Sequence, residues 1–245
     1  MGFWNRFLGT SGAEQNVNAA GGILFPRHRR RHHHPAHTSS CDPRLAAQVL
    51  HMALDRAAAL SFTPTRDITI DDVDFDYYGG PQGFQAEFLT ALLSLDEEDG
   101  TPLFPRVFFF DPEYIQSNDS SATLLWSIAE AASTRSSFSD VHCDLHFGPD
   151  FYDNPVGELH YRHHGEEVHH DVAVEGEWVD IDAITHVFIH ATPEGHKWLT
   201  NNDFTLHVWA PEKHAPEVAR ILSEEDAAAD HRLARETHPR MDSTE

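Results

Sequence analysis

His142, Asp144 and His146 stand two residues apart in the stretch from Asp140 to Phe147. Apolar residues fill the positions between them, and this alternation is typical of a β-strand with one buried face. The two imidazoles and the carboxylate would then share the opposite face, where they could act as ligands for zinc or another divalent ion. An exposed polar face on a half-buried sheet produces the same alternation without any ligand.

A second candidate metal set consists of Asp182, His186 and His190. In a helix, spacings of four place all three on one face, and two histidines four apart can bind one metal ion. The zinc-protease form of this pattern has a glutamate directly after the first histidine, and Val187 holds that place here. As a strand, the segment would put His186 and His190 on one face with Phe188. The spacing leaves helix and strand open.

Further histidines flank a predicted turn at Gly165, in the pairs His163-His164 and His169-His170. Adjacent residues of a strand point to opposite faces, so at most one residue of each pair can join a common site. The polar rim of a hairpin explains these pairs equally well.

The sequence lacks the signatures of several enzyme classes. It has no glycine-rich phosphate loop with Lys-Ser/Thr, no dinucleotide fingerprint and no Gly-x-Ser-x-Gly elbow. Cys143 lies beside His142, but its apolar register favours core packing over a nucleophilic thiol. The acidic residues between Asp71 and Asp76 lack the glycine and distal glutamate of a calcium loop. No catalytic residue and no organic cofactor is therefore predicted, and zinc or another divalent metal remains the only cofactor considered.

The charge of the chain is divided unevenly. Residues 1–40 carry five arginines against Glu14, a formal charge of +4, whereas the rest of the chain carries −27. An acidic body of this kind repels nucleic acid and favours a basic protein partner. The basic tract at 27–37 also contains five of the 20 histidines and reads as a solvated, low-complexity linker.

Composition shifts predict three parts. Residues 1–40 form a flexible arm that begins with a short apolar segment, and residues 3–8 could give weak peripheral association with a membrane or partner. Residues 41–223 form a globular body with a possible internal seam at 148–157. Residues 224–245 form a charged tail that is partly helical or disordered. No segment has the length and apolarity of a transmembrane helix, and the N-terminus does not read as a signal peptide.

Helices are predicted mainly in the first half of the body. Asp42 and Pro43 mark a helix start, followed by an apolar stripe through Leu45, Val49, Met52 and Leu60. A strand is predicted at 66–75, one helix at 84–95, a buried central strand at 107–111 and a helix from Ser120 or Ser121.

Strands are predicted mainly in the second half, at 140–147, on both sides of Gly165, and in a hairpin that turns at Asn201-Asn202. Residues 215–222 close the body as a helix. This order predicts the α+β class, with a helix-rich first half, a mainly antiparallel sheet and a C-terminal helix.

Two functions follow from these patterns. The first is an acidic, non-catalytic binding protein, inhibitor-like or subunit-like, that engages a basic partner. The second is a divalent-metal-dependent hydrolase that uses one of the His/Asp sets on the C-terminal sheet. With two cysteines in 245 residues, a reducing, cytoplasmic location is expected.

Overall fold

The computed structural model describes residues 42–97, 100–110, 119–146, 154–174 and 179–237. The chain divides into two units, Met1–His37 and Thr38–Glu245, and the described residues belong to the second. The predicted arm at 1–40, with its apolar segment at 3–8, lies outside them. In the described part, six α-helices and two three-stranded antiparallel sheets follow the predicted order, which confirms the α+β class.

Helix α1 (Pro43–Ala59) begins as the sequence predicts. The Asp42 carboxylate accepts a hydrogen bond from the Arg44 amide at 2.9 Å and so caps the helix. The buried face differs from the predicted stripe, because Leu45 and Met52 are 41% and 45% exposed. Small side chains occupy much of the contact instead, since the buried residues of α1 are Ala46, Val49, Leu50, Ala53 and Ala57.

The strand predicted at 66–75 is wrong. Part of this stretch is a short 3-10 helix, η2 (Ile70–Asp72). The Asp72 carboxylate accepts from the Thr69 amide at 2.7 Å and also pairs with Arg66 at 2.8 Å. These local hydrogen bonds satisfy the backbone within the segment and favour the turn over a sheet ladder.

The single helix predicted at 84–95 is two helices, α2 (Pro81–Ala86) and α3 (Phe88–Leu93), which meet at Glu87. Helix α6 (Ala215–Thr237) explains the break. The buried Glu225 carboxylate accepts from the amides of Leu89 and Thr90 at 2.8 Å each, at the start of α3. Because Glu225 belongs to this contact, the C-terminal helix continues past its predicted end at residue 222, into the segment assigned to the tail.

The central sheet has the strand order β1-β6-β5, formed by β1 (Val107–Phe109), β6 (Leu206–Pro211) and β5 (His196–Thr200). The predicted hairpin is confirmed, since β5 and β6 pair with each other and the loop between them contains Asn201-Asn202. Strand β1 was predicted to be central, but it lies at the edge and pairs only with β6 among the described strands. Helices pack against both faces of this strand. It is therefore buried, and its residues are apolar, although it lies at the edge of the sheet.

The outer sheet has the order β2-β3-β4, formed by β2 (Phe138–His146), β3 (Val156–His163) and β4 (Glu166–Ala173). A two-residue turn of His164 and Gly165 joins β3 to β4. Both turn residues have positive φ, 51° and 84°, as a tight hairpin of this length favours.

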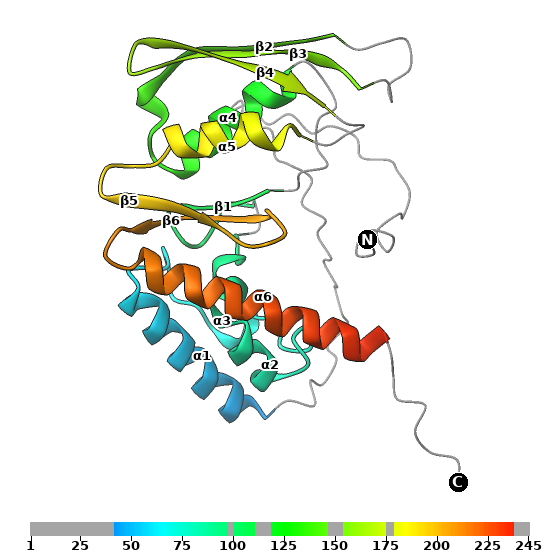
Figure 1. The fold of residues 1–245 in the computed structure, drawn as a ribbon. Coiled ribbons are helices and arrows are strands. Elements are labelled where there is room, and N and C mark those ends of the chain that lie inside the picture. The colour runs from blue at the N-terminus through cyan, green and yellow to red at the C-terminus, as the bar shows by residue number, and fades with distance from the viewer. Residues whose placement is uncertain (1–41, 98–99, 111–118, 147–153, 175–178, 238–245) are drawn as a thin grey trace. The chain divides into compact units, whose positions relative to one another are not determined.

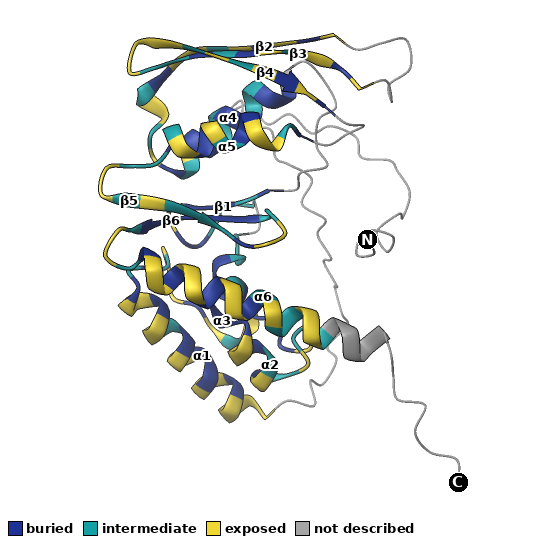
Figure 2. Ribbon diagram, in the orientation of Figure 1, coloured by how far each residue is buried: buried dark blue, intermediate teal, exposed yellow. Residues whose placement is uncertain are grey.

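Helices α4 (Asp119–Ala131) and α5 (Ile181–His190) lie between the two sheets (Figure 1). Phe188 of α5 packs on the central sheet, with its ring 4.0 Å from that of His207 and 5.1 Å from that of Trp198. The other face of the central sheet is covered by α1, α3 and α6. Burial follows these layers, because the outer sheet is buried toward the helices and exposed on its other side (Figure 2).

Candidate metal centre

Strand β2 places His142, Asp144 and His146 on the exposed face of the outer sheet. Cys143 and Leu145 between them are buried on the opposite face. The predicted alternation is therefore confirmed for this strand, and Cys143 packs in the core, as its register indicated.

The antiparallel register brings further histidines to the same outer face. His160 of β3 lies opposite His142, and His169 of β4 lies opposite His160. The rings of His142 and His160 are stacked, with centroids 4.7 Å apart and planes 6° apart. The ring of His169 meets that of His160 edge-on, with centroids 4.5 Å apart. One row of imidazoles thus crosses all three strands.

Two overlapping groups of metal-ligating side chains result. In the first, one donor atom each from His142, Asp144 and His160 lies within 4.8 Å of the others. In the second, Glu158 and His169 stand with His160 at the same spacing. His146, from the predicted set, belongs to neither group. The first group, which we call the outer triad, has the two imidazoles and the carboxylate expected of a site for zinc or a similar divalent ion.

A hydrogen bond and an ion pair fix the orientation of the imidazoles. His142 Nδ1 lies 3.1 Å from the Asp140 carbonyl oxygen. A carbonyl can only accept, so Nδ1 carries the proton and Nε2 keeps a free lone pair for a ligand bond. His160 Nε2 lies 2.9 Å from a Glu158 carboxylate oxygen, an interaction that also holds that ring in place.

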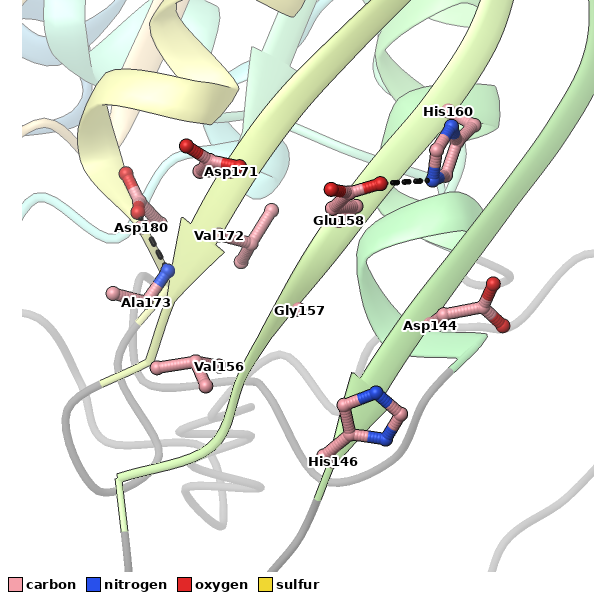
Figure 3. A pocket seen from close by; sticks show the side chains of 10 residues that line it. All are labelled: Asp144, His146, Val156, Gly157, Glu158, His160, Asp171, Val172, Ala173 and Asp180. Atoms are coloured by element: carbon pink, nitrogen blue, oxygen red, sulfur yellow. Dashed lines mark hydrogen bonds and ion pairs between the residues drawn. The ribbon is translucent and has the colours of Figure 1, made fainter.

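A cavity of about 600 Å³ opens beside the outer triad. Its wall includes Asp144 and His160 of the triad, and Figure 3 shows the lining residues, which come from the three outer-sheet strands and, for Asp180, from the start of α5. Three further carboxylates reach it, those of Glu158, Asp171 and Asp180. Among the described residues, the lining contains no lysine or arginine, so this part of the cavity is acidic, and it adjoins two of the candidate ligands directly.

Asp180 holds one side of this cavity in shape. Its carboxylate caps α5 by accepting from the Ala183 amide at 3.0 Å, and it also accepts from the Ala173 amide at the end of β4 at 2.8 Å. Gly157 allows the strands to approach on the other side, because a Cβ there would lie 1.8 Å from the Asp144 carbonyl oxygen. Both residues therefore serve the geometry of the wall.

The second predicted set is on a helix, since α5 covers Asp182, His186 and His190. The donor atoms of these three residues do not converge. Among the described residues, the groups whose donor atoms lie within 4.8 Å of one another are the two on the outer sheet. His186 instead stacks on His170 of β4, with ring centroids 4.6 Å apart. His190 stacks on His163 of β3 at 4.7 Å.

Three of these four histidines, His163, His170 and His190, are partly buried, whereas His186 is exposed. Burial lowers the pKa of His163, His170 and His190 below the usual value, and neighbouring imidazoles lower it further. Between the two stacks, the Tyr161 hydroxyl lies 2.8 Å from His190 Nδ1 and 3.2 Å from His170 Nε2. Burial raises the pKa of that phenol, so it remains a neutral hydrogen-bonding bridge.

Glu158 was not singled out from the sequence, and neither His160 nor His169 was predicted to lie beside His142 and Asp144. The two-residue turn at Gly165 contained a usable signal, because it pairs residue 163 with 166 and therefore 160 with 169. The register of β2 on β3 had no such signal, since a longer connection does not fix strand register.

Comparisons with protein-family models, with curated proteins and with solved structures found no match. Among the described residues, none of the helices combines the length and apolarity that crossing a membrane requires.

Proposed function

We propose that this chain binds a divalent metal ion, zinc by preference, through His142, Asp144 and His160. The observation that carries the proposal is the convergence of one donor atom from each within 4.8 Å. Ligand atoms of a tetrahedral zinc site lie about 3.4 Å apart, given zinc-to-ligand distances of about 2.1 Å. Side-chain rotations can close the difference, because the strands that carry the three residues are already paired.

The chemistry of such an ion would be hydrolytic. Three protein ligands leave a coordination position for water, and bound zinc lowers the pKa of that water to about 7. The adjoining cavity offers room for a substrate next to this position. The Glu158 carboxylate, 2.9 Å from His160 Nε2, would be a candidate to take a proton from that water.

Metal content and affinity test this proposal directly. Protein purified without an affinity tag is analysed for metals, and zinc binding to metal-free protein is measured by calorimetry. We expect one tight zinc per chain and a loss of affinity of about tenfold or more in His160→Ala. His146→Ala and His51→Ala serve as controls, because His146 lies outside the triad and His51 is exposed on α1. Absence of stoichiometric zinc binding, or equal loss in the controls, overturns the proposal.

A second function is favoured by the acidic cavity. Four carboxylates, from Asp144, Glu158, Asp171 and Asp180, line it, and no lysine or arginine of the described part of the chain lies among them. A basic side chain of a protein partner would offset this charge, in keeping with the −27 body. Under this proposal the protein is a non-catalytic accessory or inhibitor-like protein.

An arginine-rich peptide tests the second function. We expect Asp171→Asn to weaken binding more than Asp55→Asn does, since Asp171 lines the cavity and Asp55 is exposed on α1. Binding should also fall as salt rises. Equal weakening by both variants would show general attraction to an acidic surface. Competition between zinc and the peptide would place both ligands at one site.

A further inference from the structure

The inner face of the outer sheet meets the C-terminal end of α5 through histidine rings. His163 and His190 stack with their planes 7° apart, and His170 and His186 with their planes 21° apart. The Tyr161 hydroxyl lies between the stacks, bonded to one ring of each. We call the contact of His163, Tyr161 and His190 the hairpin interface, because it joins the β3–β4 hairpin to the helix.

His163 and His190 cannot both be protonated without cost while their rings are stacked. Neutral imidazole can stack closely, whereas two protonated rings with centroids 4.7 Å apart repel each other. His163 Nε2 is buried and lacks a hydrogen-bond partner in the described part of the chain. Burial therefore opposes protonation of this ring, although the His190 backbone favours it.

Some of the surrounding groups oppose protonation of these histidines, and others favour it. His190 and His164 oppose protonation of His163, whereas the His190 backbone and Glu166 favour it. On the side of the helix, His186 opposes protonation of His190, as does His170 from β4. Two further effects favour the charged forms, Asp180 near His170 and the helix C-terminus near His190. Strand β2 contributes an apolar ring, Phe138, 5.0 Å from His163.

We propose that proton uptake by His163 and His190 opens the hairpin interface as the pH falls from about 7.5 to 5.5, the range in which free histidine titrates. The hairpin is the part that moves, because α5 is anchored elsewhere. Phe188, on the side of the helix away from His190, packs on the central sheet against Trp198 and His207. Once the contact separates, both rings and the Tyr161 hydroxyl reach water.

This inference does not rest on the metal proposal. The outer triad lies on the other face of the sheet, and neither His163 nor His190 belongs to either metal-ligating group. The experiment is done in the presence of a chelator, so its failure leaves the zinc-binding result unaffected.

Hydrogen exchange of backbone amides tests the inference on the full chain. Exchange is followed at pH 7.5, 6.5 and 5.5, corrected for the intrinsic pH dependence of exchange. We expect the opening constant of the β3–β4 hairpin to rise on acidification, by up to about tenfold per pH unit for each proton taken up. Amides of α1 should show no matching rise. An unchanged hairpin, or an equal rise in α1, overturns the proposal.

A double variant assigns the effect to the two rings. H163Q/H190Q should remove the extra opening at pH 5.5, whereas His51→Gln on α1 should retain it. Persistence of the full effect in the double variant also overturns the proposal. Because that variant could fail to fold, the imidazoles of the unmodified protein are titrated by NMR as well. Titration of both rings at or above pH 6.5 contradicts the proposal without any variant.

Discussion

The two faces of the outer sheet carry the same residue type in opposite environments. On the outer face, His142 and His160 stack beside the Asp144 carboxylate and next to an open cavity. On the inner face, His163 and His190 also stack, but against a helix and with partly buried rings. A ring stack alone therefore does not define a role. The nearby carboxylates and the adjoining cavity make the outer stack a candidate ligand set, although His160 is itself partly buried, whereas burial makes the inner stack a packing contact that resists protonation.

His207, in the central sheet, is more deeply buried than the histidines on the inner face of the outer sheet. It is fully buried in the central sheet, where Nδ1 accepts from the Trp198 indole at 3.2 Å and Nε2 donates to the Phe204 carbonyl at 3.1 Å. Burial lowers its pKa to about 3, so the ring is neutral in the folded protein.

The largest effect is expected for His207→Leu. This change keeps the volume but removes both hydrogen bonds, and we expect a loss of about 2–3 kcal/mol in the free energy of unfolding. Urea denaturation at pH 7 measures it, with His51→Leu on the surface of α1 as the control. A loss no larger than in the control would show that the ring contributes only apolar packing.

The next effect is a dependence of stability on pH. The folded protein keeps His207 neutral, whereas the unfolded chain takes up a proton near pH 6.5, so stability is complete above pH 6.5 and falls below it. The expected slope is about 1.4 kcal/mol per pH unit from this residue. Urea denaturation is compared at pH 7.5, 6.5 and 5.5.

Glu225 has the opposite effect on the pH dependence of stability. Burial raises its pKa to about 7, so the folded protein takes up a proton between that value and 4.5, and stability rises as the pH falls through this range. The difference between the unmodified protein and His207→Leu therefore isolates the histidine. Identical slopes for the two proteins would contradict the assignment to His207.

A smaller effect is expected for Tyr161→Phe. The hydroxyl joins the two inner stacks, and its removal should cost about 1 kcal/mol in the free energy of unfolding. Tyr77→Phe is the matched control, since Tyr77 is exposed. Equal stability of the two variants would mean that the inner histidines do not depend on the bridge.

The smallest effect on stability is expected for His142→Ala on the outer face. Its side chain is exposed, so the free energy of unfolding should change by no more than about 0.5 kcal/mol. Zinc affinity should nevertheless fall, as for His160→Ala. A large loss of stability in metal-free protein would show that histidines on the outer face also stabilise the fold, contrary to this prediction.

Several features of the fold were predictable because their cause is local. Asp42 and Pro43 start α1 through a cap that involves adjacent residues. The turn at His164 and Gly165 pairs two strands that follow each other in the chain. In both cases the interacting atoms are a few positions apart, so spacing alone carries the information.

Other features depended on distant contacts and were predicted wrongly or left open. The helix at 84–95 is divided where Glu225, well over 100 positions away in the chain, caps the start of α3. The exposure of Leu45 and Met52 depends on which face of α1 meets its neighbours. Residues 181–190 form a helix although their β-branched content also suited a strand.

For the candidate site, the sequence by itself determined that His142 and Asp144 share a face, because alternation is built into an extended backbone. It also determined the acidity of the body and the absence of several enzyme signatures. The tertiary structure decided that His160, and not His146, completes the outer triad, and that His190 packs against a strand. The physical reason is register: which residues of different strands stand opposite each other depends on pairing between segments, and spacing within one segment does not contain it.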